Sequence, residues 1–249
     1  MSVETPEELA ALRRAGRAVA ATLREVGRLV RPGVTTAELD AAAARVLARH
    51  GARSAPALVY GFPGAICISV GDEAVHGIPG SRRLRAGELV TLDVTAELDG
   101  FFADAAVTLP VGKVAPRLGR LAAAAQAALR RGMAAATAGA PLNGIGAAVQ
   151  AEAERRRCTV LGELCGHGIG RTIHEDPSVP NVYVAGLDEP LRDGTVITIE
   201  PILALGGDDR VRAAPDGWTM LTADGSPSAH AEHTIVVSEG RPLVLTATG

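Results

Sequence analysis

The spacing of apolar residues along the chain changes between two periods, and these changes predict the order of helices and strands. Apolar residues at helical spacing predict four helices, over about residues 7–29, 36–50, 116–137 and 142–157. Thr35 and Glu38 form a T-x-x-E capping box, which marks the start of the second helix because each side chain can satisfy a free backbone N–H. Runs typical of strands follow each pair of helices, over about 65–70, 88–94, 101–109, 159–164, 195–203 and 233–237. The order of two helices followed by strands therefore occurs twice.

The two parts of this repeated order also resemble each other in their residues. Gly87-Glu-Leu-Val-Thr-Leu-Asp93 aligns without a gap on Gly194-Thr-Val-Ile-Thr-Ile-Glu200, glycine on glycine and carboxylate on carboxylate. Further along each half, Asp104 falls on Glu232. One such match is a common turn-to-strand pattern, but two carboxylate pairings favour an internal repeat. We therefore predict a single catalytic domain over 1–249, with halves of about 1–112 and 113–249 that bring four carboxylates together.

Composition indicates which side chains fill the interior, which partners are excluded and in which compartment the protein is expected. Hydrophobic residues make up 47% of the chain and aromatic residues only 2%, which predicts a core of aliphatic side chains and alanine. Twenty-five basic and 28 acidic residues give a net charge of −3, without a basic patch for nucleic acid. The N-terminus lacks the pattern of a signal peptide, and no apolar run approaches the ~20 residues that cross a membrane. With three cysteines that cannot all pair, we expect a reduced, cytoplasmic protein without a membrane partner.

Two acids interrupt predicted strands that are otherwise apolar, Asp93 after Leu-Val-Thr-Leu and Glu200 after Val-Ile-Thr-Ile. A buried carboxylate is costly unless it is paired, hydrogen-bonded or bound to a metal. Either acid alone is explained as a strand-end carboxylate that accepts backbone N–H groups, but four in equivalent positions favour a cation. Cys165-Gly-His167-Gly-Ile-Gly adds an imidazole between glycines that allow a close approach of the backbone.

One histidine and four carboxylates form a hard, oxygen-rich donor set. Such a set suits Mn(II), Fe(II) or Co(II) better than a structural zinc site built from thiolates. It can hold two ions roughly 3.5–4 Å apart, an arrangement that generates a hydroxide nucleophile and polarises a carbonyl. The pattern therefore favours hydrolytic chemistry.

Several segments resemble the ligand motifs of the pita-bread metallopeptidases. They are Asp93, Asp104, Cys165-Gly-His167-Gly-Ile-Gly, Thr198-Ile-Glu200-Pro and Glu232-His-Thr. Further segments are similar to those of type I methionine aminopeptidases: Cys67-Ile-Ser, Val75-His76-Gly-Ile-Pro79, Asp99-Gly-Phe, Asp216-Gly-Trp218 and Glu232-His-Thr-Ile-Val-Val. The motifs are specific in combination, and the resemblance covers nearly the whole chain. It implies an α+β pita-bread fold, in which two pseudo-symmetric halves share a central antiparallel sheet covered by helices.

The resemblance implies a role for each of five ligands. His167 and Glu200 bind one divalent ion, Asp93 binds the other, and Asp104 and Glu232 bridge the two. The ions implied are Co²⁺, Mn²⁺, Fe²⁺ or Zn²⁺, without a choice among them. A hydroxide that bridges the metals is the nucleophile, and Glu200 acts as general base and then as general acid.

The resemblance also implies how a substrate is held. His174 donates to the developing oxyanion, and His76 hydrogen-bonds the substrate backbone; without the family context His76 is better explained as an ordinary loop histidine. The substrate is a peptide or nascent chain that begins with methionine and a small second residue. A monomer with transient ribosome contact is expected. The residues assigned to substrate binding are Phe62, Cys67, His76, Ile173, His174 and Trp218.

Three departures from the family pattern bear on this expectation. Ala105 and Ala106 stand where threonine and serine are usual, which predicts weaker metal binding because hydroxyls that orient Asp104 are lost. Ile173 replaces a phenylalanine of the methionine pocket, and His230 replaces a glutamine. The pocket is therefore expected to be altered.

Two alternatives stay open. An Xaa-Pro aminopeptidase or dipeptidase of the same fold shares all five ligands, although the short N-terminus argues against it. A metal-free binding protein of this fold is kept open by Ala105 and Ala106, although the intact ligands argue against it.

Overall fold

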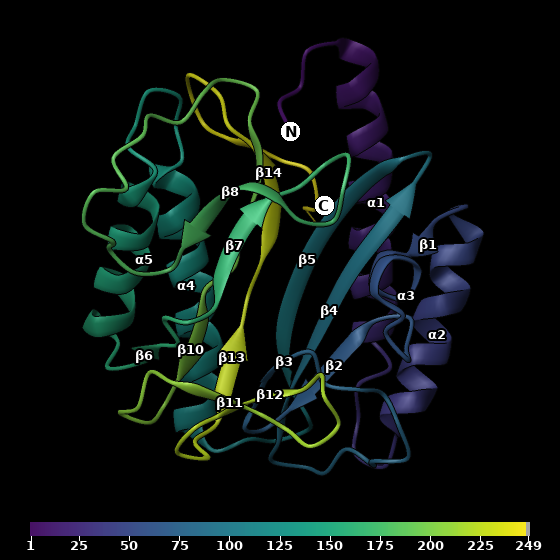
Figure 1. The fold of residues 1–249 in the computed structure, drawn as a ribbon. Helices are drawn as coiled ribbons and strands as arrows, with labels where there is room; N and C mark the ends of the chain where they lie inside the picture. The colour runs from purple at the N-terminus through teal and green to yellow at the C-terminus, as the bar shows by residue number, and fades with distance from the viewer. Residues whose placement is uncertain (248–249) are drawn as a thin grey trace.

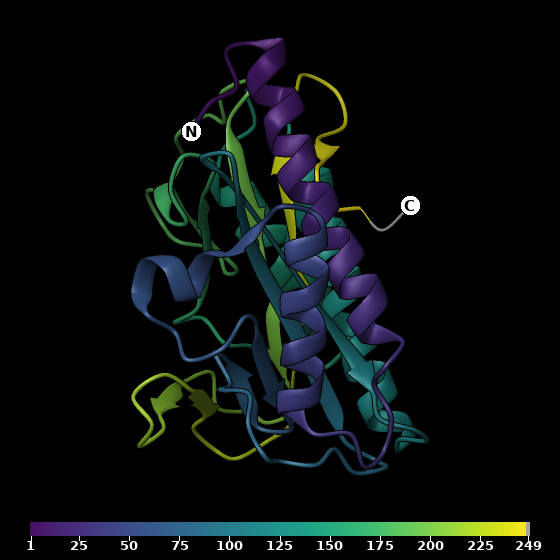
Figure 2. The ribbon, with the colours of Figure 1, turned by 90° about the vertical axis from the view of Figure 1, so that its right-hand side faces the viewer.

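Two pairs of helices flank the strands in the computed structural model, which describes residues 1–247 (Figure 1). α1 (Pro6–Gly27) and α2 (Thr36–Arg49) lie side by side on the outside of the first half, as Figure 2 also shows. α4 (Pro116–Ala135) and α5 (Asn143–Arg155) form the corresponding pair in the second half. All four predicted helices are confirmed, with ends that move by a few residues. No helix within 1–247 is both long and apolar enough to cross a membrane.

The helix starts follow from local chemistry. Thr35 accepts a hydrogen bond from the backbone N–H of Glu38 at 3.1 Å, and Glu38 accepts one from the N–H of Thr35 at 2.7 Å, which confirms the capping box. A short helix, α3 (Ala55–Tyr60), was not predicted. Ser54 caps it and Gly61 ends it at φ 72°, a backbone conformation that favours glycine. Its six residues are too few to show a helical period in the sequence.

The first half contains the longest strands. β4 (Leu89–Leu98) and β5 (Phe101–Pro110) pair antiparallel over their whole length, from Leu89 opposite Pro110 to Leu98 opposite Phe101. The turn between them, Asp99-Gly100, has positive φ at both positions, as a tight hairpin requires. The other strands of this half are shorter: β1 (Arg53–Ser54), β2 (Cys67–Val70) and β3 (Glu73–Val75).

The second half contains short strands joined by loops. The predicted strand over 195–203 was wrong as one element, because the chain forms β9 (Val196–Ile199) and β10 (Ile202–Ala204) in different sheets. Pro201 lies at the break and has no N–H for a ladder. Of the strand predicted over 159–164, only β6 (Thr159–Val160) forms. The remaining strands are β7 (Cys165–Gly168), β8 (Glu175–Pro180), β11 (Val211–Ala213), β12 (Met220–Thr222), β13 (Ser228–His230), β14 (His233–Val236) and β15 (Leu243–Val244).

The halves meet where β5 passes the segment between β13 and β14. The Thr234 hydroxyl donates to the carbonyl of Asp104 at 2.7 Å and accepts from its N–H at 2.8 Å, and the N–H of Glu232 donates to the carbonyl of Ala106 at 3.0 Å. Each half also has its own apolar cluster, one beneath α1 and α2 and one beneath α4 and α5. The predicted boundary near residue 112 falls between β5 and α4, and the single-domain assignment stays a prediction.

Candidate active site

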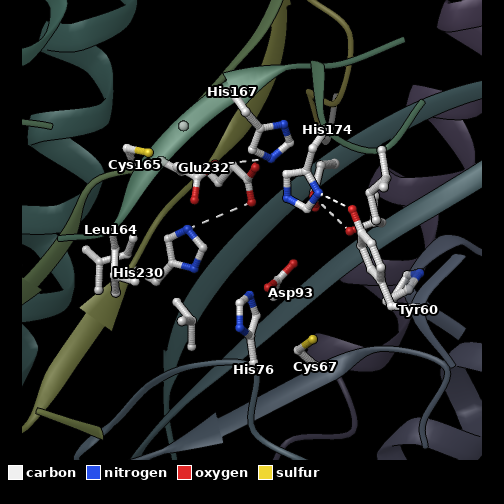
Figure 3. A pocket seen from close by; sticks show the side chains of 18 of the residues that line it. Tyr60, Cys67, His76, Asp93, Leu164, Cys165, His167, His174, His230 and Glu232 are labelled. Atoms are coloured by element: carbon white, nitrogen blue, oxygen red, sulfur yellow. Dashed lines mark hydrogen bonds and ion pairs between the residues drawn. The ribbon is translucent and has the colours of Figure 1, made fainter. Parts of the chain in front are cut away.

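One cavity of about 440 Å³ is lined by residues of both halves (Figure 3). All the residues predicted for the site lie on its wall, although they are spread from the first helices to the last strands of the chain. They are Phe62, Cys67, His76, Asp93, Asp104, His167, Ile173, His174, Glu200, Trp218 and Glu232.

Four carboxylates gather on one side of this cavity. Asp93 and Asp104 extend from the paired strands β4 and β5, Glu200 follows β9, and Glu232 lies between β13 and β14. The Thr95 hydroxyl, opposite Asp104 in the hairpin, donates to Asp104 Oδ2 at 2.7 Å. The other oxygen, Asp104 Oδ1, is buried and has no hydrogen-bond partner within the described residues.

Burial raises the pKa of all four carboxylates. Burial is the main cause and neighbouring negative charge adds to it, so the pKa values of Asp93 and Glu232 rise well above the ordinary range. Burial raises the pKa of Asp104 to about 6 against the hydrogen bond from Thr95, and raises that of Glu200 to about 8 with Asp104 adding to the effect. Four buried carboxyl groups at one cavity strongly attract positive charge.

His167 is placed with one ring nitrogen free toward these acids. Its Nδ1 lies 2.9 Å from the carbonyl of Gly168, to which a protonated Nδ1 donates, so the lone pair is left on Nε2. Nε2 lies 3.5 Å from Glu200 Oε1. A Cβ at Gly168 would lie 2.1 Å from the carbonyl oxygen of Asp176, and so the glycine permits this close approach of β7 and β8. Burial lowers the pKa of His167 to about 4, which keeps the ring neutral.

These side chains fit a divalent cation. Asp104, His167 and Glu232 each offer a ligand atom within 4.8 Å of the others. Asp104 Oδ1, which has no hydrogen-bond partner among residues 1–247, and the lone pair of His167 Nε2 can each coordinate a cation. Nitrogen and carboxylate donors without a thiolate suit the harder divalent ions, as the sequence predicts. Asp93 and Glu200 adjoin this group and enlarge the donor set.

Two further histidines face the cavity. The ring of His174 lies 4.2 Å from the ring of His167, measured between centroids. His76 lies on a loop after β3 with φ 58°, a strained conformation for a residue with a side chain. Such strain is typical of functional positions, and the adjoining Gly77 is packed against the backbone of Ile68. Desolvation lowers the pKa of His174 and, with a contribution from His174, that of His76, which favours neutral rings.

Apolar side chains also line the cavity. The rings of Phe62 and Trp218 meet edge to face with centroids 5.3 Å apart, and Cys67 and Ile173 are buried beside the cavity. Trp218 lies on a loop held by Asp216, whose carboxylate accepts from the N–H of Trp218 at 2.9 Å. These four apolar side chains form a slot beside the carboxylates of the same cavity.

The departures from the family pattern have different structural consequences. Ala105 points away from the cavity into the cluster beneath α1 and α2, where a side-chain hydroxyl would not reach the carboxylate of Asp104. Thr95 orients that carboxylate instead. His230 is 2% exposed, and neither ring nitrogen has a hydrogen-bond partner in the part of the chain that is described; its Nε2 lies 3.8 Å from Glu232 Oε2.

Two residues of the site were missed by the sequence analysis. Thr95 carries a recognisable signal, since it lies two positions after Asp93 on the same face of β4. Tyr60 carries none. Its hydroxyl lies 2.6 Å from His174 Nδ1, although the two residues are far apart in the sequence.

The chain is similar to known proteins over almost its whole length. A model of metallopeptidase family M24 matches residues 10–239. Methionine aminopeptidase 2 of Bacillus subtilis is 43% identical over 248 residues, which cover 99% of each chain. The crystal structure of methionine aminopeptidase from Rickettsia prowazekii superposes with a TM-score of 0.94 at 36% identity, over 99% of this chain and all of that one. This similarity confirms the α+β pita-bread fold.

One solved structure resembles this chain in fold at a lower sequence identity. Xaa-Pro dipeptidase from Bacillus anthracis superposes with a TM-score of 0.77 at 22% identity, and this chain covers 62% of it. At that identity the likeness extends to the fold alone.

Proposed function

Because the chain belongs to metallopeptidase family M24, we propose that it removes the N-terminal methionine from peptides and nascent proteins. The observation that carries the proposal is the meeting of five predicted metal ligands with an apolar slot in one cavity. Full-length similarity to methionine aminopeptidases supports the choice of substrate. With such a substrate, we expect the protein to act in the cytoplasm, near ribosomes.

Asp93, Asp104, His167, Glu200 and Glu232 would hold two divalent ions. When bound, the ions supply Lewis-acid activation of water and of the scissile carbonyl. The protein contributes a rigid donor set, because each element of the set is fixed by a hydrogen bond or a paired strand. The Thr198 hydroxyl illustrates this, since it accepts from the N–H of His167 at 3.0 Å and donates to Glu200 Oε1 at 2.7 Å.

The proton transfers fall to Glu200 and the stabilisation of charge to His174. Glu200 faces the cavity, and its ionised carboxylate can accept the proton of the attacking water and return it to the leaving amine. His174, as a neutral ring, can donate an N–H to the oxyanion of the tetrahedral intermediate. His76 would donate to the peptide backbone of the substrate.

The apolar slot would take the methionine side chain. Phe62, Cys67, Ile173 and Trp218 offer polarisable and aliphatic surface without a charged group, which suits a flexible thioether. The α-amino group would then lie toward the acids, which attract a cationic N-terminus. A small second residue is favoured because the scissile bond must lie inside the cavity, between the apolar slot and the carboxylates.

The test compares two tripeptides on protein whose metal content is measured. Met-Ala-Ser should be hydrolysed by the reconstituted protein with two ions per chain, and Ala-Pro-Ala should be hydrolysed at least a hundredfold more slowly. Preference for Ala-Pro-Ala would identify the Xaa-Pro peptidase of the same fold. Stoichiometric metal without turnover of either peptide, or no metal at all, would leave the binding protein as the better explanation.

A further inference from the structure

Tyr60 makes a contact across the two halves that the proposed chemistry does not yet use. It is the last residue of α3 in the first half, and its hydroxyl lies 2.6 Å from Nδ1 of His174, on the loop between β7 and β8 in the second half. Figure 3 shows the two side chains directed toward each other at the edge of the cavity. The two rings are tilted by 38° with centroids 5.7 Å apart.

The backbone on both sides of this contact is fixed. On the tyrosine side, Gly61 ends α3 in the left-handed conformation and Phe62 is buried against Trp218. On the histidine side, the Thr172 hydroxyl donates to the carbonyl of His174 at 2.9 Å. The hydrogen bond between the side chains adds a directional restraint on the imidazole ring, beside its packing against the ring of His167.

The direction of this hydrogen bond determines what the ring offers to the cavity. A neutral imidazole carries one hydrogen, either on Nδ1 or on Nε2. A phenol O–H is a stronger donor than an imidazole N–H, and an imidazole nitrogen is a stronger acceptor than a phenol oxygen. The favoured arrangement has Tyr60 as donor and Nδ1 as acceptor, which leaves the hydrogen on Nε2. Figure 3 shows that nitrogen on the side of the ring away from Tyr60, toward the cavity.

We propose that Tyr60 is a positioning residue that fixes His174 in the Nε2–H tautomer and orients this N–H into the cavity. The inference rests on the proposed function, in which His174 donates to an oxyanion, because only a ring with the hydrogen on the cavity side can do so. Without the hydroxyl, the ring samples both tautomers and more than one orientation. A fraction of the molecules then presents a lone pair to a negatively charged oxygen.

The tautomer can be measured directly by NMR on protein labelled with ¹⁵N-histidine and loaded with Zn²⁺, which is diamagnetic. Two-bond ¹H–¹⁵N correlations distinguish the tautomers, and the signals of His174 are assigned by their loss in His174→Ala. Wild type should show Nε2–H, and Tyr60→Phe should shift both ¹⁵N signals toward an average. The matched control is Tyr183→Phe, since Tyr183 is the other tyrosine of the two in the chain and is 58% exposed. The Nδ1–H tautomer in wild type, or identical spectra for Tyr60→Phe, would overturn the proposal.

Kinetics on Met-Ala-Ser give a second, independent readout. Tyr60→Phe should lower kcat by about threefold to tenfold, the scale of one hydrogen bond between neutral groups, and leave KM unchanged. His174→Ala should lower kcat by roughly 10²–10³-fold, and adding Tyr60→Phe to it should cost nothing more. Tyr60→Phe could instead raise KM alone, or lower kcat by the same factor in wild type and in His174→Ala. Either result would make Tyr60 a contact for the substrate and contradict a role through His174.

These outcomes separate the inference from the function on which it rests. If His174→Ala keeps a normal kcat, His174 is not the oxyanion donor and the proposed role of this residue fails. The NMR result still decides whether Tyr60 sets the tautomer. If Tyr60→Phe shifts the ¹⁵N signals as expected but keeps the wild-type kcat, only the catalytic part of the inference is overturned.

Discussion

The two halves of the molecule contribute to the cavity through different kinds of structure. The first half presents Asp93 and Asp104 from strands that are ten residues long and paired throughout. The second half presents His167, His174 and Glu200 from a short strand with a register shift, from a loop and from the residue after a strand. The paired strands hold two of the four carboxylates, whereas the irregular segments hold the other two, Glu200 and Glu232, together with His167 and His174. The repeated order of elements therefore does not imply repeated roles.

Threonine hydroxyls are common to both halves and connect them. Thr95 orients Asp104 within the first half, Thr198 links His167 to Glu200 within the second, and Thr234 joins the backbone of Asp104 across the two. Each hydroxyl is both small enough for a buried strand and able to donate and accept. Removing a charge from the regular half, altering the cavity wall in the irregular half and titrating an acid there each test this difference between the halves.

The largest effect is expected from Asp104→Asn, which removes a charge from the regular half. We expect no measurable turnover of Met-Ala-Ser and less than two ions per chain by elemental analysis, because a neutral amide holds cations poorly. The fold should persist, and in chelator the variant should melt no lower than wild type, since one of four mutually repelling carboxylates is lost. Asp188→Asn, at an exposed position, is the matched control. Turnover at the wild-type rate would remove Asp104 from the metal site.

A smaller effect is expected from Ile173→Phe, which alters the wall in the irregular half. Ile173 is buried between the cavity and a cluster that contains Phe101 and Phe102, so it leaves part of the slot less filled than a phenylalanine would. We expect wild type to prefer Met-Ala-Ser but to cleave Leu-Ala-Ser detectably. Ile173→Phe should raise the ratio of the two kcat/KM values about tenfold, which corresponds to ~1.4 kcal/mol.

The control for this variant is Ile169→Val, which loosens the same cluster at a residue that does not line the cavity. It should leave the ratio of kcat/KM for the two peptides unchanged. An unchanged or inverted ratio in Ile173→Phe would show that this side chain does not shape the methionine slot.

The smallest effect concerns the stability of the metal-free protein, measured in chelator between pH 7 and 8.5. The folded pKa of Glu200, about 8, lies above its ordinary value of 4.5, so the folded chain holds a proton that the unfolded chain has lost. This stabilisation is complete at low pH and is lost as the pH rises through about 8. Asp93 and Glu232 shift in the same direction. The free energy of unfolding should therefore fall across this range, by at most about 1.4 kcal/mol per pH unit for each proton.

The pH range avoids an opposing contribution from buried histidines. Burial lowers the pKa of His167 to about 4 and of His230 to about 3, so these rings favour unfolding only below about pH 6.5, where the unfolded chain takes up protons. Glu200→Gln is the comparison variant, and its slope should be smaller than that of wild type. A free energy of unfolding that is constant or rises from pH 7 to 8.5 would contradict the raised pKa values.

Features that depend on residues close together in the chain could be predicted from the sequence. Helix starts follow from caps such as Thr35 with Glu38, and the strands predicted over 88–94 and 101–109 correspond to β4 and β5, although β4 runs on to Leu98. The five candidate ligands were also found from the sequence, four as acids at repeated positions in or near apolar strands and His167 from a motif with glycines on both sides, and their role as ligands stays a prediction. The structure gathers all five at one cavity.

Contacts between distant segments follow from the tertiary structure alone. How the halves meet decides the contact between the Tyr60 hydroxyl and His174 Nδ1, and it leaves the ring of His230 without a hydrogen-bond partner within residues 1–247; no local pattern encodes that geometry. The structure also shows that Ala105 points into the core and that Thr95 donates to Asp104, while weaker metal binding caused by Ala105 and Ala106 stays a prediction. Local patterns fix which residues can carry a charge or a proton. The packing of the halves fixes which of them meet, because that packing depends on burial and hydrogen bonds summed over the whole chain.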